Sequence, residues 1–75
     1  MYAPADISSR IKQQAKMKKV AIKDMLASCE LGINTLANMN SGRVPLADNL
    51  ARIADYLDCS VDYLLGRTDN PDVNK

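Results

Sequence analysis

Apolar residues recur every three or four positions along most of this chain, which is the period of helices that bury one face. In the first segment Ile7, Ile11 and Ala15 share such a face, and Asp6 is expected to cap a helix that begins near it. The other residues of this segment are expected to face solvent: Arg10, Lys12, Gln13, Gln14, Lys16 and Lys18.

The longest apolar stripe lies in the second half of the chain and predicts a helix that ends at residues 58–59. Its members are Leu46, Leu50, Ile53, Ala54 and Leu57. After it, Ser60 is expected to cap a short helix over 61–65, which Gly66 ends.

Residues 22–39 carry two short stripes separated by a break at 30–32. The first stripe has apolar residues at i, i+3, i+4 and i+7: Ile22, Met25, Leu26 and Cys29. Leu36 and Met39 resume the spacing after the break. Ala21 stands where a capping Ser or Thr is expected. Two short helices joined by a few residues form a helix-turn-helix, whose second helix enters the DNA major groove.

The second of these helices is the candidate recognition element. Its exposed residues are predicted to be Ile33, Asn34, Thr35, Ala37 and Asn38. The Asn amide pairs bidentately with an adenine edge, so two of these residues suit base reading. The helix is expected to end at residues 40–43, with Gly42 in the left-handed conformation.

Composition supports an all-α domain, because the chain has no Trp, Phe or His and must build its core from aliphatic side chains. We expect five helices around one core, with residues 1–66 as the domain and 67–75 as a polar tail or the start of a linker. The predicted core contains Ile11, Leu26, Leu36, Leu50, Ile53, Leu57 and Leu64.

Charge is divided unevenly along the chain. Residues 1–43 hold seven basic and three acidic residues, whereas residues 44–75 hold three basic and six acidic residues. This asymmetry fits a footprint on a polyanion, and it fits equally a solvated lysine face on the first helix.

The residues for catalysis and for metal or cofactor binding are missing. Without His there is no general base of the usual kind, and three isolated glycines make no phosphate-binding loop. Asp55, Asp58 and Asp62 are better explained as solvated helix ends. Cys29 and Cys59 have no second Cys or His pair for zinc. We therefore expect no enzyme, no catalytic residue, no metal and no cofactor.

The expected location is the cytoplasm, with no membrane association. No apolar run is long enough to span a bilayer, and the first residues lack a basic flank and an apolar core for a signal peptide. Cys29 and Cys59 are accordingly expected to be reduced thiols in the core rather than a disulfide.

From about Ile7 to Gly66 the chain resembles the Cro and phage-repressor (Xre-type) helix-turn-helix family of DNA-binding regulators. The resemblance is carried by Arg10-Ile11-Lys12, by residues 22–39, by Ser41-Gly42 and, most specifically, by the run from Leu50 to Gly66. It implies a five-helix, lambda-repressor-like domain with the helix-turn-helix at its second and third helices.

The resemblance also implies contacts with DNA. Ile22 stands where the family usually has a Gln that contacts phosphate, so this contact is either lost or passes to Lys23. The loop after the third helix is expected to contact phosphate through backbone amides and Arg43. Asn38 matches a base-reading position. The implied DNA-binding residues are Lys23, Gly32, Ile33, Asn34, Thr35, Asn38, Ser41, Gly42 and Arg43.

Four further positions depart from the family pattern. Ile33 cannot hydrogen-bond a base but can pack on a thymine methyl group. Glu30 replaces a common turn glycine and brings an acidic charge near the DNA. Ala15 and Asn40 replace a buried Arg–Glu pair, and both partners are absent together, so no unpaired buried charge remains.

The resemblance implies sequence-specific binding of double-stranded DNA by a phage-like transcriptional repressor, associated with the nucleoid in the bacterial cytoplasm. The expected state is a homodimer on a two-fold operator, with an interface near the last two helices. The alternative is a protein–protein module, such as an antitoxin or an antirepressor-responsive domain with an antirepressor or toxin partner, because the recognition helix lacks Lys and Arg and is rather apolar.

Overall fold

A computed structural model describes residues 3–70 of the chain and shows an all-helical fold, as the composition predicts. The helices are α1 (Pro4–Met17), α2 (Ile22–Ser28), α3 (Thr35–Asn40), α4 (Ala47–Tyr56) and α5 (Val61–Leu65). Within the described residues there is no strand, and none of these helices has the length and apolar character needed to cross a bilayer.

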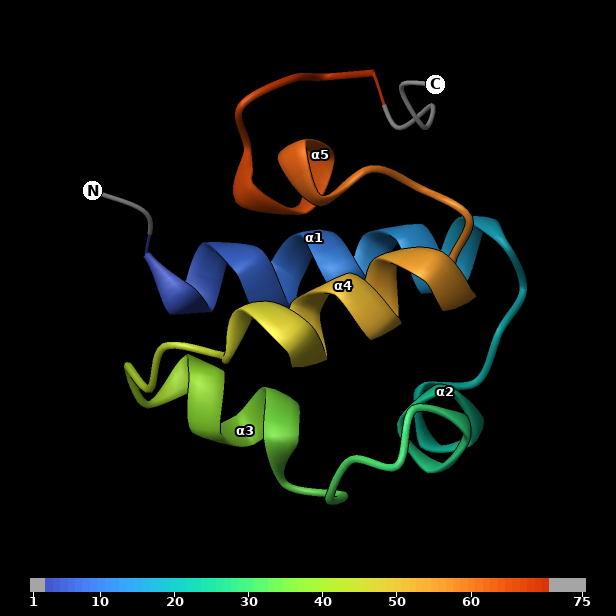
Figure 1. Ribbon diagram of the computed structural model, residues 1–75, viewed down its shortest axis with the longest axis vertical. Coiled ribbons are helices and arrows are strands. Elements are labelled where there is room, and N and C mark those ends of the chain that lie inside the picture. The colour runs from blue at the N-terminus through green and yellow to red at the C-terminus, as the bar shows by residue number, and fades with distance from the viewer. Residues whose placement is uncertain (1–2, 71–75) are drawn as a thin grey trace.

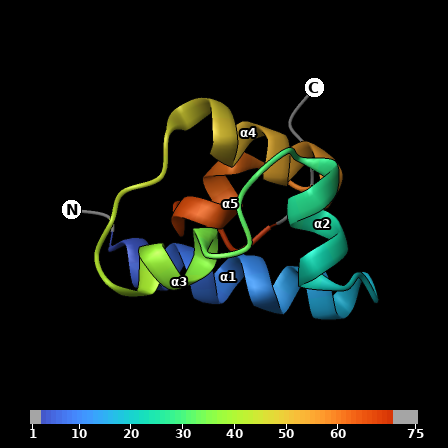
Figure 2. The same ribbon diagram turned by 90° about the horizontal axis from the view of Figure 1, so that it is seen from below.

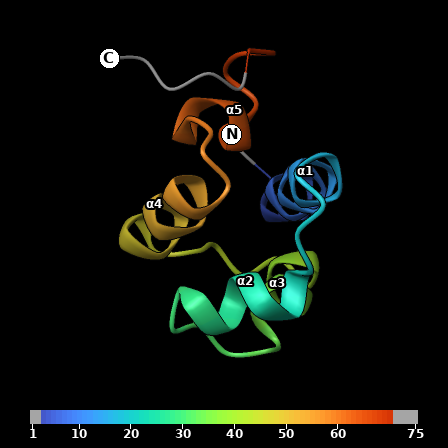
Figure 3. The same ribbon diagram turned by 90° about the vertical axis from the view of Figure 1, so that its right-hand side faces the viewer.

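The helices are arranged around a middle layer formed by α1 and α4 (Figures 1 and 3). Helix α5 lies at one end of the molecule and packs against both of them. Helices α2 and α3 lie at the other end, where α3 packs against α1 and α2 packs against α4. Figure 2, seen from that end, shows the connection that joins α2 to α3. The segment 22–40 is therefore held by two different helices.

The core is aliphatic and confirms the predicted positions. All seven residues predicted for it are buried, and Ile11, Ile53 and Leu64 have no exposed surface at all. Met25 and Met39 complete the cluster from α2 and α3. Cys29 and Cys59 are buried free thiols, as predicted.

The predicted residues at the helix starts are confirmed for α2 and α5 and are wrong for α1. Ala21 caps α2 without a side-chain hydrogen bond, and Ser60 caps α5 by accepting a hydrogen bond from the Tyr63 N–H at 3.0 Å. The prediction that Asp6 caps the first helix is wrong. The helix begins at Pro4, whose ring presets a helical φ, and Asp6 lies in the first turn, where its charge favours the helix dipole.

The five helices within residues 3–70 end in the same way, with a residue in the left-handed conformation. The next N–H then bonds to the carbonyl oxygen five residues back, as in a Schellman motif. The left-handed residues are Lys19 (φ 59°), Glu30 (φ 59°), Gly42 (φ 100°), Asp58 (φ 53°) and Gly66 (φ 83°). Gly42 and Gly66 confirm the predicted helix ends, whereas the other three positions carry the strain of a Cβ atom.

Burial of the following residue accounts for these strained ends. Val20 and Leu31 pack against the core, and Cys59 is buried within it. Each follows a non-glycine left-handed residue, so the turn directs the next apolar side chain inward. The free energy gained by removing that side chain from water is large enough to offset a left-handed conformation, which costs about 1–2 kcal/mol.

Two residues differ from their expected exposure. Leu46 was predicted on the buried stripe, but it caps α4 from outside the helix and is 69% exposed. Gln14 was predicted to face solvent, but it is buried together with Ser8 on the face of α1 that holds Ile11. Gln14 Oε1 and Ser8 Oγ have no hydrogen-bond partner within residues 3–70. Packing of two helices on α1 buries a wider face than the apolar stripe alone indicates.

Candidate nucleic-acid interface

A tight turn over Gly32–Thr35 leads into α3. The Thr35 N–H and the Thr35 hydroxyl both donate to the Gly32 carbonyl oxygen, at 3.1 and 2.6 Å. Ile33 and Asn34 therefore occupy the two corners of a turn, which corrects their predicted place on the recognition helix. Helix α3 begins only at Thr35 because this residue closes the turn with both of its donors.

Asn34 and Asn38 are one helical turn apart, as the sequence predicts. The Asn34 carbonyl accepts a hydrogen bond from the Asn38 N–H at 2.8 Å, although Asn34 itself is the N-cap. Both residues are exposed. In the described part of the chain, neither side-chain amide forms a hydrogen bond. Each retains its full set of donors and acceptors for an external partner.

The segment after α3 offers fewer donors than the resemblance implies. The backbone N–H groups of Ser41, Gly42 and Arg43 all donate to carbonyl oxygens of α3, and the Ser41 hydroxyl donates to the Ala37 carbonyl at 3.2 Å. The expectation of free backbone amides here is therefore wrong, because the helix end consumes them. The exposed Arg43 side chain, which has no ion pair among the described residues, is the remaining donor to an anion.

A hollow of about 320 Å³ lies between α3 and the start of α4. It brings together three of the predicted residues, Thr35, Asn38 and Arg43. It also includes residues that the sequence analysis did not assign to the site: Met39, Val44, Pro45, Leu46 and Asn49. The missed signal is the apolar run Val44-Pro45-Leu46, which stands directly after a helix end. Val44 and Leu46 are 70% and 69% exposed.

The remaining predicted residues do not line this hollow. Lys23 is the second residue of α2 and is exposed. It lies close in sequence to Lys18 and Lys19, which are also exposed at the link from α1 to α2. Asp48 and Asp55 lie on α4 and Asp62 lies on α5, whereas Lys12 and Lys16 lie on α1 and Lys23 lies on α2, so acidic and basic side chains belong to different helices here.

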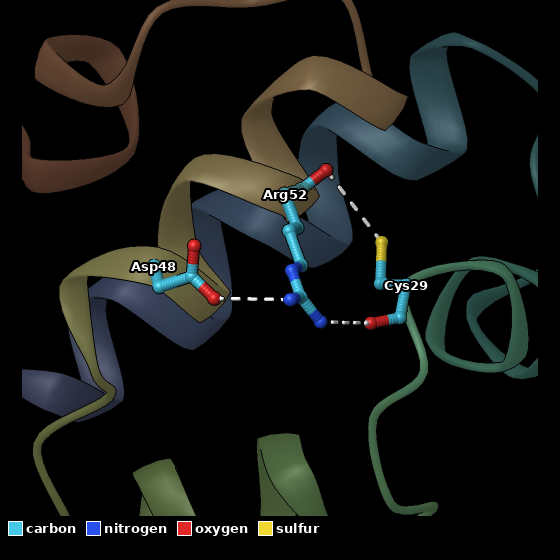
Figure 4. Close-up of polar contacts among 3 residues, drawn as sticks. All are labelled: Cys29, Asp48 and Arg52. Atoms are coloured by element: carbon cyan, nitrogen blue, oxygen red, sulfur yellow. Dashed lines mark hydrogen bonds and ion pairs between the residues drawn. The ribbon is translucent and has the colours of Figure 1, made fainter.

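Arg52 of α4 holds the end of α2 in place (Figure 4). Its Nη1 donates to the Cys29 carbonyl oxygen at 3.5 Å, and its Nη2 pairs with Asp48 Oδ2 at 3.2 Å. Cys29 Sγ in turn donates to the Arg52 carbonyl at 3.6 Å. Burial raises the pKa of the Cys29 thiol, which keeps the donor proton in place. A guanidinium at the carbonyl end of α2 also complements the helix dipole.

Among residues 3–70, no three His, Cys, Asp or Glu side chains gather as metal ligands would. The exposed Asn amides, the Arg43 side chain and the exposed lysines near α2 supply hydrogen-bonding groups and positive charge for binding an external partner. None of the protein-family models, curated proteins or solved structures compared with this chain matches it.

Proposed function

We propose that this protein binds double-stranded DNA in a sequence-specific manner as a transcriptional repressor of the Cro and phage-repressor type. In this proposal α2 and α3 form a helix-turn-helix, and α3 lies in the major groove. One observation carries it: two exposed Asn amides without partners in residues 3–70 stand one turn apart at α3, and an exposed Arg43 follows the helix end.

The dimensions of α3 suit this role. Six residues form a helix about 9 Å long, and the major groove is about 12 Å wide. Asn34 and Asn38 would read base edges, whereas Arg43 on one side and Lys23 on the other would contact phosphate groups. Phosphate contacts position the protein, and base contacts provide the specificity.

The proposal includes a homodimer on a two-fold operator. The molecule measures 30 × 28 × 20 Å. Two recognition helices in successive major grooves on one side of the duplex are about 34 Å apart. Two copies at this spacing would lie nearly in contact, so a small interface between them is enough to form the pair.

A second candidate is binding to a protein, such as an antirepressor or toxin. The observation that favours it is the exposure of three large apolar residues around α3, namely Ile33, Val44 and Leu46. The two candidates differ in their response to salt, because binding through phosphate contacts weakens steeply as the salt concentration rises.

The test is selection from a random double-stranded DNA library, followed by titration of the enriched and scrambled duplexes at several salt concentrations. Enrichment of a palindrome with steep salt dependence supports the proposal. Failure to bind any duplex at low salt would overturn it and leave the protein-binding candidate.

Two variants then separate base reading from positioning. Asn38→Ala should lower affinity for the enriched duplex by about 1–3 kcal/mol while binding to the scrambled duplex stays the same. Arg43→Ala should weaken binding to both duplexes alike and reduce the salt slope by about one. Both residues are exposed, so neither variant should alter the fold. A changed base preference in Arg43→Ala and an unchanged one in Asn38→Ala would contradict these roles.

A further inference from the structure

Ile33 is the most exposed large apolar residue of the described chain, at 73%. It lies at a corner of the turn before α3. The Thr35 N–H and hydroxyl both donate to the Gly32 carbonyl oxygen and close that turn, which fixes the backbone positions of Ile33 and Asn34. An apolar side chain held in water at this position has much to gain from an apolar partner.

The surrounding segment has a second property, which is the absence of cationic side chains. Residues 31–42 contain no Lys and no Arg. Guanine is read most often by Arg or Lys on its O6 and N7 atoms, whereas Asn pairs with the N6 and N7 atoms of adenine. The thymine 5-methyl group is read by apolar contact. The exposed side chains of this segment therefore suit an A·T base pair. The segment lacks the Arg or Lys that usually contacts guanine in a G·C base pair.

We infer that this surface reads A·T base pairs, with Asn34 and Asn38 on adenine edges and Ile33 against a thymine 5-methyl group. The inference rests on the DNA binding proposed above and adds the chemical class of the base pairs. Thr35 acts as a positioning residue, because its hydroxyl is already donated to Gly32 and its two bonds set where Ile33 and Asn34 stand.

The experiment uses the full chain and the duplex enriched by selection from the random library. Each thymine is replaced in turn by deoxyuridine, which lacks only the 5-methyl group. At one thymine per half-site this replacement should lower the affinity of the wild type about four-fold, which corresponds to the free energy of burying one methyl group. Replacing an adenine read by Asn with guanine, and its partner with cytosine, should lower affinity about 5- to 150-fold.

Ile33→Ala should bind the thymine and deoxyuridine duplexes equally. Met17→Ala is the matched control, because Met17 is an apolar residue of similar exposure, 66%, at the far end of α1. It should keep the full deoxyuridine penalty. Circular dichroism establishes that both variants fold.

The outcomes separate this inference from the proposed function. A palindrome whose specific positions are G·C would overturn the inference while leaving DNA binding intact. The same holds if no thymine is sensitive to deoxyuridine, or if Ile33→Ala keeps the penalty. Absence of binding to every duplex would overturn both.

Discussion

At the scale of single residues, conformation at helix ends matters as much as burial. Lys19, Glu30 and Asp58 adopt the left-handed conformation without being glycine. Glu30 is the instructive one, because its position in the α2–α3 connection is where the family resemblance implies a glycine. The backbone there has the conformation that glycine prefers, while the residue supplies a Cβ atom and a negative charge.

Replacing Glu30 should separate these two effects. Glu30→Gly removes both the strain and the charge, and it should raise the free energy of unfolding by up to about 1 kcal/mol, which is a rise of about 4–8 °C in Tm. Glu30→Ala is the matched control, since it keeps the Cβ atom and removes only the charge. Under the proposed function, both variants should bind DNA more tightly than the wild type, because each removes a negative charge near the proposed interface. Equal Tm values for the Gly and Ala variants would show that strain at this position is negligible.

Buried thiols make the stability of the folded protein depend on pH in the alkaline range. Burial raises the pKa of Cys59 above its ordinary value of 9.0, with Asp58 adding to the rise and Lys18 opposing it. The folded state therefore holds this proton more tightly than the unfolded chain. The resulting stability is complete below pH 9 and is lost as the pH rises through the folded-state pKa.

Urea unfolding between pH 8 and pH 10.5 measures this effect. As the pH rises, the free energy of unfolding of the wild type should fall more steeply than that of Cys59→Ala, which has no thiol at position 59 and keeps Cys29. The comparison is between slopes, so a lower overall stability of the variant does not disturb it. Parallel slopes would mean that the Cys59 thiol ionises equally in the folded and unfolded chain.

At the scale of elements, the helices differ in how their first turns are satisfied. Among the described helices, α5 alone has a side-chain cap, from Ser60. Helix α2 begins after Ala21, whose φ of −73° and ψ of 133° are those of a good N-cap residue. The geometry for a cap is present, and only the side-chain oxygen is missing.

Ala21→Ser should therefore stabilise the protein by about 0.5–2 kcal/mol. The expected signature in urea unfolding is a higher midpoint with an unchanged slope. Ala21→Val is the control, because it adds side-chain atoms without an acceptor oxygen. A midpoint for the Ser variant no higher than that of the Val variant would argue against a missing cap.

At the scale of the whole molecule, one core joins helices from both ends of the chain. Leu50 of α4 belongs to that core and is 5% exposed. Leu46, four residues earlier and on the same sequence stripe, is 69% exposed. The two leucines share one sequence stripe, but Leu46 precedes the helix as its N-cap, whereas Leu50 lies within the helix and is covered by the core.

Leu50→Ala should cost about 2–5 kcal/mol, a large share of the stability of so small a domain. Leu46→Ala should change stability by less than about 0.5 kcal/mol. Thermal unfolding followed by circular dichroism measures both, and the loss in Leu50→Ala should appear as one cooperative transition. Similar Tm changes in the two variants would refute the observed burial difference.

The amino-acid sequence alone determined the number and type of the helices, the seven core positions and the glycine-ended helices. These properties depend on spacing along the chain and on local backbone preference. It also determined that Asn34 and Asn38 stand one turn apart, because the i to i+4 relation survives the shift of the helix start to Thr35.

The tertiary structure alone decided which helix faces are covered and which hydrogen-bond donors are already used. Spacing shows which residues share a face, but only the neighbouring helices decide whether Gln14 is covered or Leu46 is left exposed. In the same way, the Schellman bonds use the backbone amides after α3 and leave the exposed Arg43 side chain available to an external partner. Burial and hydrogen-bond pairing depend on residues distant in sequence or on the conformation of a turn, and an apolar pattern encodes neither.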